Sequence, residues 1–434
     1  MDRQLALWKQ KATRHPSTLR VLVIVATVVI GLGVWILRRP DQFLHPYVWV
    51  EESNILDLYQ AHGFLFAAIH QDTGYLQWPT TFTVALAAAI SFLHIPQIDY
   101  WLSTAWFLAT MLLILLPASL LRLRWRVGMV LAFVLAPMGP EIFGVALYIF
   151  WWTSLWPLIT ILWSKDYWWL RIPVLILGGM SSLAGAAIAV PYAVLWAITR
   201  RRRDLVGTIV LAATLAVQIP VYLTSYRASQ VPFHLSRIVE QEVRNFSYYL
   251  LAIVSPAPSD LLVFVGACMI LAIAGFVAWS VVRGKPNHNE LLALFVGLFV
   301  MGGLSAIPAP LLSDPIHDGP RYYFFSFVVL AWVLLLVAAT PNVARLGKQW
   351  WERQWWELPI ARFAAVGIVV LSLFVLPRTF TEHDDTVNWS AQLARCHTAT
   401  DSFSVPVQYN GQLSRMWNGR LTITPGTCRR LGYR

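Results

Sequence analysis

The sequence predicts an all-α polytopic membrane protein with about eleven transmembrane helices. Hydrophobic residues make up 57% of the chain and charged residues only 13%, whereas soluble domains carry roughly 25% charged residues. Long apolar runs, such as residues 21–37 and 261–282, supply the roughly 20 residues that a helix needs to cross a bilayer. Clusters of basic residues lie between these runs, as expected for the cytoplasmic ends of spans.

The basic clusters set the expected orientation. Five basic residues precede the first apolar run, which predicts a cytoplasmic N-terminus. Further clusters lie in residues 122–126, 200–203, 283–285 and 345–353. The net charge of +11 is therefore interpreted mainly as a topology signal, with an anionic lipid or phosphate substrate as a further partner. No nucleic-acid partner is expected.

Counting crossings between these cytoplasmic anchors gives the span assignment. An odd number of crossings must lie between the first exit and Arg122, so the threonine- and alanine-rich stretch 78–95 is expected not to cross. The expected spans are residues 20–38, 100–121, 127–140, 145–163, a pair of short helices within 172–199, then 205–223, 260–282, 290–307, 322–340 and 361–377.

Two parts of the chain are distinguished. Residues 1–377 form the transmembrane module, whose first outer loop, residues 39–99, is expected to carry juxtamembrane helices. Residues 378–434 form a short outer C-terminal tail. It contains Cys396 and Cys428, and two cysteines in one small polar segment predict a disulfide in an oxidising compartment. An outer tail is also what eleven crossings from a cytoplasmic N-terminus predict.

Acidic residues are rare, so their positions are informative. Glu51 and Glu52 lie in the first outer loop, where repulsion between close carboxylates favours one raised pKa and a general base. The pair could equally bind a divalent cation or be a solvated helix start. Glu141 follows Pro140 at the outer end of a predicted span. It is a candidate catalytic or metal-binding carboxylate, or else a helix cap.

Candidate phosphate-binding residues lie in two later outer segments. Arg321 and Tyr322 begin a span, with His317 just before them. This arginine could hold a phosphate by charge-assisted hydrogen bonds, or contact lipid headgroups. Arg237 belongs to a basic amphipathic stretch that is either a lipid-phosphate patch or a solvated face. The chain has no phosphate-loop pattern and no Gly-Xaa-Ser-Xaa-Gly motif, which argues against an ATP-driven pump and a common hydrolase.

Together these motifs resemble the multi-spanning glycosyltransferases of the GT-C class. The resemblance is greatest to compact bacterial members that modify cell-surface polysaccharides such as O-antigen or cell-wall glycans. It is carried by Arg39-Pro40-Asp41 before Trp49 and the acidic pair, by Gly74-Tyr75-Leu76, by Glu141 followed by Trp151, and by Arg321-Tyr322-Tyr323. Two features depart from the pattern. Pro79 is followed by Thr80 where the compact members have arginine, and the chain has no large soluble C-terminal domain.

The resemblance implies an enzyme of the bacterial inner membrane with a periplasmic active site and tail. Its donor would be a polyprenyl-phosphate sugar, and its acceptor a hydroxyl of a glycan or lipid. Glu52 or Glu51 would be the base, and Glu141 would orient the acceptor or assist a divalent cation such as Mg²⁺ or Mn²⁺. The donor and its phosphate would be bound by Arg321, His317, Tyr322, Arg237 and Tyr75.

Three other functions remain open from the sequence. A polysaccharide polymerase or ligase would use a lipid-pyrophosphate donor, and usually has a longer late outer loop than this chain. A membrane acyltransferase would need an intramembrane histidine. A transporter or flippase of lipid-linked sugars would favour internal repeats and charges within the spans.

Overall fold

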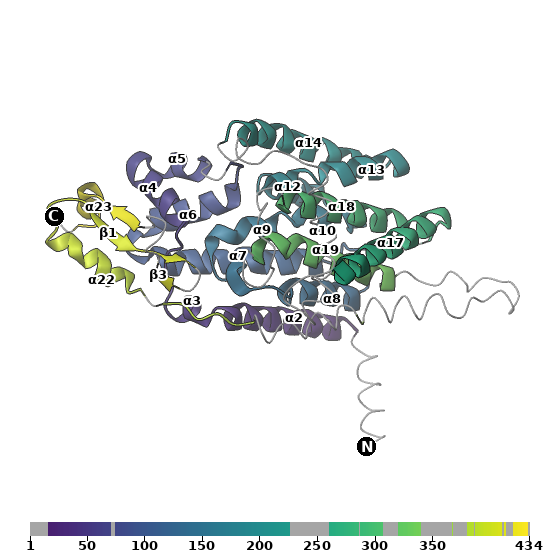
Figure 1. The fold of residues 1–434 in the computed structure, drawn as a ribbon, viewed down its shortest axis with the longest axis horizontal. Coiled ribbons are helices and arrows are strands. Elements are labelled where there is room, and N and C mark those ends of the chain that lie inside the picture. Colours follow the sequence, from purple (N-terminus) through teal and green to yellow (C-terminus); the bar gives the residue numbers. More distant parts are fainter. Residues whose placement is uncertain are drawn as a thin grey trace, which may run out of the picture.

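The structure is a computed structural model, and it consists mostly of helices that run roughly along one long axis (Figure 1). The described residues are 16–70, 74–225, 260–285, 287–306, 320–339, 367, 380–385, 387–409, 412–413 and 420–432.

Six helical segments in this described part are long and apolar enough to cross a membrane. They are Thr18–Arg38, Phe92–Leu115, Arg202–Leu223, Phe264–Val282, His288–Ser305 and Arg321–Ala339. The helices that form them are α2 (Pro16–Arg38), α7 (Ile95–Leu115), α14 (Arg202–Leu223), α17 (Asp260–Val282), α18 (His288–Ala306) and α19 (Phe324–Ala339). Their length and composition indicate a membrane protein in contact with lipid.

The predicted count of about eleven spans is not supported. Two predicted spans, 127–140 and 145–163, are instead short helical segments, whereas residues 172–199 form short helices as predicted. A helix of 12 residues is only ~18 Å long. The segments are α8 (Leu123–Val134), η3 (Ala146–Tyr148), α9 (Ile149–Thr153), α10 (Trp156–Ile161), α11 (Trp168–Gly179), α12 (Leu183–Ala186) and α13 (Ala189–Thr199). The predicted span 361–377 lies outside the described residues, apart from residue 367.

These short helices pack inside the bundle. Every residue of α9 and α10 is buried, so other helices cover the ends where backbone groups lack helical partners. Gly178 of α11 shows how close the packing is, because a Cβ atom there would lie 2.4 Å from Cδ of Pro157. Sequence periodicity does not distinguish a full span from two half-length helices meeting inside a bundle.

The first outer loop contains the juxtamembrane helices that the sequence predicts. They are α3 (Pro40–Leu44), α4 (Glu52–His62), α5 (Phe64–Ile69), α6 (Trp78–Ile90) and η1 (Phe92–His94). Helix α6 has 13 residues and is too short to cross a membrane, which agrees with the prediction that residues 78–95 do not cross. The next span begins at Phe92 rather than at residue 100. Gln218 of α14 holds the loop by accepting from Leu76 N at 2.9 Å and donating to Leu76 O at 3.1 Å.

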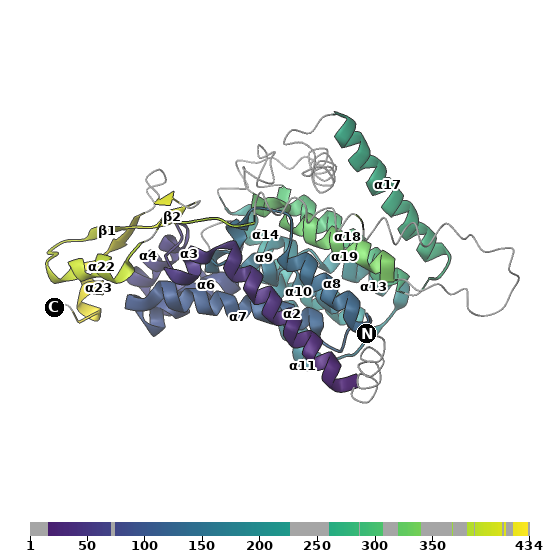
Figure 2. The ribbon, with the colours of Figure 1, turned by 90° about the horizontal axis from the view of Figure 1, so that it is seen from below.

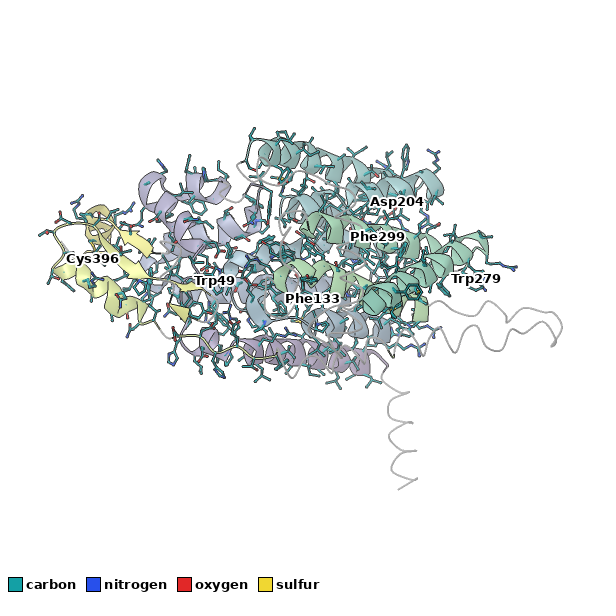
Figure 3. All side chains as sticks on the ribbon, in the orientation of Figure 1. Trp49, Phe133, Asp204, Trp279, Phe299 and Cys396 are labelled. Carbon is teal, nitrogen blue, oxygen red and sulfur yellow. A yellow bond between two sulfur atoms is a disulfide. The ribbon has the colours of Figure 1, made fainter. Side chains whose placement is uncertain are left out.

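Different elements lie at the two ends of the bundle (Figures 1 and 2). Helices α4 to α6 and the described part of the tail lie at one end. Asp204, beside the basic cluster 200–203, and Trp279 lie toward the other end, as Figure 3 shows, while Trp49 and Cys396 lie at the first. The basic cluster 200–203 and the described part of the tail are thus at opposite ends of the bundle.

The tail is small and mixed in structure, which an all-α prediction misses. It contains α22 (Trp389–Leu393), η6 (Ala394–His397), β1 (Phe403–Pro406), β2 (Gln408–Tyr409), β3 (Gln412–Leu413), β4 (Arg420–Ile423) and α23 (Pro425–Arg430). Strand β1 pairs antiparallel with β4, and β2 with β3. The predicted disulfide between Cys396 and Cys428 is present and joins η6 to α23.

The tail packs against helix α4 and is hydrogen-bonded to it. The Gln60 side chain donates to Thr422 O at 2.8 Å and accepts from the Thr427 hydroxyl at 2.7 Å. Farther along the tail, Trp389 Nε1 donates to Phe92 O at 3.0 Å. These contacts join the end of the chain to the first outer loop.

We expect the disulfide to stabilise the docked tail. Replacing both cysteines with serine (Cys396→Ser with Cys428→Ser) opens a link across 32 residues, for which a loss of about 2–4 kcal/mol is typical. Limited proteolysis of purified protein should then cut the tail faster than in the parent. Cys268→Ser, at the exposed free cysteine, is the matched control. Equal cutting rates in all three proteins would contradict a stabilising disulfide.

Candidate functional site

Two distant stretches of the chain, residues 140–148 and 320–323, meet near the tail. Glu141 lies in the short helix η2 (Pro140–Ile142), Tyr148 ends η3, and Arg321 lies in η4 (Pro320–Tyr323) ahead of α19. The Tyr148 hydroxyl donates to Glu141 Oε1 at 3.0 Å, and Arg321 Nη1 forms an ion pair with the same oxygen. The structure therefore brings together two of the charged residues singled out in the sequence.

Glu141 and Tyr148 bond the same nitrogen of the Arg321 guanidinium. Its Nη1 bonds both Glu141 Oε1 and the Tyr148 hydroxyl, the latter at 3.2 Å. Its guanidinium carbon lies 5.1 Å from the centre of the Tyr322 ring. Glu141 and Tyr148 both bond Nη1, and within the described part of the chain no hydrogen bond runs from Nε or Nη2.

Glu51 faces the same ion pair. Its carboxylate interacts electrostatically with both Arg321 and Glu141, and it lies near the Trp49 side chain. Burial raises the pKa of Glu51 above its usual value of 4.5, and the positive charge of Arg321 offsets only part of this increase. Glu51 Oε2 is buried and accepts no hydrogen bond from the residues that the structure describes. A carboxylate in this setting can accept a proton.

Glu52 has a different environment, although it is the next residue. Its Oε2 accepts from Trp49 N at 2.8 Å and its Oε1 from Leu147 N at 2.9 Å. Asp99 of α7 hydrogen-bonds the same carboxyl group. Burial raises the pKa of Glu52 to about 7. Glu52 therefore links the first outer loop to η3 and α7, with both oxygens occupied.

Arg39 links the site to the tail. Nε and Nη2 of Arg39 donate to the two carboxylate oxygens of Asp384, at 3.2 and 2.7 Å, and the arginine is fully buried. Glu382 adds a weaker ion pair at 3.6 Å. Close by, Asp41 accepts from His383 Nδ1 at 2.8 Å and from Asp384 N at 3.0 Å. The Arg39-Pro40-Asp41 sequence thus binds the tail.

Trp49 lies at the junction of these groups, where the tail meets the helices (Figure 3). Its ring is 4.9 Å from the guanidinium carbon of Arg39 and 5.8 Å from the ring of Tyr148. Sequence reasoning did not identify Tyr148 or Asp384. Tyr148 stood among many aromatic residues, and the partner of Asp384 lies 345 positions away along the chain.

The remaining predicted site residues are placed as follows. The ring of Tyr75 lies 5.9 Å from that of Phe150. His317 and Arg237 lie outside the described residues. The described part of the chain brings no three His, Cys, Asp or Glu side chains close enough to hold a metal ion. Glu141 instead has Arg321 and Tyr148 as partners.

No protein-family model matches the chain, and comparison with curated proteins gives no significant match.

Glu51 and Glu52 should differ sharply in their effect on stability. Glu52→Gln places an amide NH₂ against one of two backbone N–H groups, so we expect a loss of about 1–3 kcal/mol and a lower melting temperature in detergent. Glu51→Gln removes a charge that burial disfavours and should not lower the melting temperature. The two neighbouring variants serve as matched controls for each other. A Glu51→Gln protein less stable than Glu52→Gln would overturn the assignment of Glu52 as the structural carboxylate.

Proposed function

We propose that the protein is a glycosyltransferase of the GT-C type. It transfers a sugar from a polyprenyl-phosphate donor to a hydroxyl of a cell-envelope glycan or lipid on the outer face of the membrane. One observation carries the proposal: Glu51, a partly buried carboxylate with a raised pKa, faces Arg321, whose hydrogen bonds to the described residues come from Nη1 alone. The motif resemblance to GT-C enzymes supports the same activity.

The reaction divides between these two residues. Glu51 takes the proton of the acceptor hydroxyl as the acceptor oxygen forms a bond to the anomeric carbon of the donor sugar. The bond from that carbon to the phosphate oxygen breaks, and its electron pair leaves with the lipid phosphate. Arg321 stabilises the negative charge that develops on this phosphate, using Nε and Nη2. General-base catalysis of this kind accelerates a reaction by about 10²–10⁴.

Glu141 and Tyr148 orient the arginine. Their contacts with Nη1 fix the guanidinium plane, and they leave its other edge for a phosphate. Glu52 is the weaker candidate for the base, because both of its oxygens already accept backbone N–H groups. Its role is to hold Trp49, and with it Glu51, against η3.

A divalent cation does not fit this arrangement well. A Mg²⁺ or Mn²⁺ site at Glu51, Glu52 and Glu141 would need carboxylate oxygens that are free to bind the ion. Glu141 is paired with Arg321, and Glu52 is occupied by backbone groups. We therefore assign the compensation of phosphate charge to Arg321.

The proposed location is the bacterial inner membrane, with the N-terminus cytoplasmic and the tail periplasmic. Two observations support this orientation. The basic cluster beside Asp204 lies at the end of the bundle opposite to the tail (Figure 3). The tail contains a disulfide, which persists in oxidising compartments such as the periplasm.

Activity measurements on purified protein test the proposal. We expect release and transfer of sugar from one member of a panel of synthetic polyprenyl-phosphate hexoses and pentoses. Glu51→Gln should lower kcat by about 10²–10⁴, and Arg321→Met by about 10²–10³. Glu52→Gln should lose less than Glu51→Gln when rates are normalised to folded protein. Full transfer by folded Glu51→Gln protein would rule out Glu51 as the base.

The pH dependence follows from the raised pKa of Glu51. A base acts in its ionised form, so kcat/KM should fall as the pH decreases through that pKa, with a midpoint above 4.5. Because Arg321 lowers the pKa of Glu51, the residual activity of Arg321→Met should lose its base at a higher pH than the parent. The kcat/KM of both proteins would be measured from acid to neutral pH. A shift of the Arg321→Met profile toward acid would contradict the pairing.

A further inference from the structure

Gln408 of the tail lies directly beside the site. Gln408 N donates to Val48 O at 3.0 Å, and Val50 N donates to Gln408 O at 2.8 Å, so Gln408 pairs in parallel with Trp49. Paired residues on adjacent strands project their side chains to the same face. The Gln408 side chain therefore lies on the Trp49 side of the tail, toward the residues that surround that ring.

The orientation of the Gln408 amide follows from its partner. The NH₂ group donates to Asp385 O, and a carbonyl oxygen can only accept, so the other amide atom is the oxygen. This Oε1 is fully buried and receives no hydrogen bond from the described residues. A buried polar atom without a partner costs about 1–3 kcal/mol, which is recovered when a ligand supplies the missing hydrogen bond.

A second such oxygen lies close by. Glu51 Oε2 is buried and unpaired among the described residues, and the Glu51 carboxylate lies near the Trp49 side chain. Two oxygens near Trp49, one from the first outer loop and one from the tail, therefore receive no hydrogen bond from the described residues. Donors are provided by hydroxyl groups, whereas an ionised phosphate diester provides none. Arg321 can donate hydrogen bonds to the phosphate of the sugar donor, whereas these two oxygens can accept hydrogen bonds from hydroxyl groups.

We propose that Gln408 Oε1 accepts a hydrogen bond from a second hydroxyl of the acceptor, next to the hydroxyl that Glu51 deprotonates. The acceptor is then a carbohydrate or a similar polyol rather than a lipid with a single hydroxyl. This inference rests on the proposed function and narrows it. The second hydroxyl does not react, and the tail becomes part of the acceptor-binding site.

Two small alcohols test the proposal because they differ in their hydroxyls. Protein purified without glycerol would be assayed for transfer to glycerol and to propan-1-ol, with the donor that the parent protein uses. The parent should prefer glycerol, judged by KM. Gln408→Met removes the accepting oxygen and should reduce this preference by about 10- to 100-fold, the effect of one lost hydrogen bond to a buried group.

Two further variants separate binding from tail stability. Gln408→Lys keeps a donor for Asp385 O but lacks the accepting oxygen, so it should lose the glycerol preference as Gln408→Met does. Gln60→Met is the matched control, because Gln60 also anchors the tail but both of its amide atoms are occupied there. It should keep the parent's preference for glycerol. Proteolysis of the tail in each variant would show whether the tail remains docked.

The outcomes distinguish this inference from the proposed function. An unchanged glycerol preference in both Gln408 variants would overturn the inference while leaving the transferase activity intact. A preference that EDTA abolishes and Mg²⁺ restores would also overturn it, since the two oxygens would then bind a cation. A parent protein that releases no sugar from any lipid-phosphate donor, to water or to alcohols, would sink the proposed function itself.

Discussion

The hydrogen bonds of Glu52 are the constraint on which the rest of the site depends. One carboxylate holds Trp49 N and Leu147 N, two backbone groups from segments that are separated by almost a hundred residues. The first bond fixes the turn that begins α4, and the second fixes η3. Glu51 follows Trp49 by two residues, and Tyr148 directly follows Leu147. Their approach to one another, and so to Arg321, is a geometric consequence of the Glu52 contacts.

The arrangement also explains why so much charge is buried at one end of an apolar bundle. An isolated buried charge is very unfavourable, so each must be paired. Arg39 is paired with Asp384, and Arg321 with Glu141. Glu51 is the exception among these groups, because its pKa is raised and one oxygen is unpaired among the described residues. A titratable group with a shifted pKa among residues whose charges are paired is characteristic of functional sites.

The sequence was informative where a feature is local and uninformative where it depends on distant partners. Apolar runs predicted the long helices, and the spacing of Cys396 and Cys428 in one polar segment predicted the disulfide. The short helices α9 and α10 were mistaken for a single span, since apolar composition is the same in both cases. Neighbouring Glu51 and Glu52 could not be told apart, because their difference lies in the contact of Glu52 with Leu147.

The tail also depends on contacts with residues that are distant in the sequence. A base with a raised pKa must be shielded from water, and at the end of a membrane bundle only protein can provide the shield. Here Asp384 neutralises Arg39 beneath Trp49, while Gln408 pairs with the backbone on either side of that residue. The tail therefore covers the segment that carries Glu51. Gln408 Oε1 in this tail receives no hydrogen bond from the described residues, so in the proposed mechanism shielding of the base and recognition of the acceptor would depend on the same docked tail.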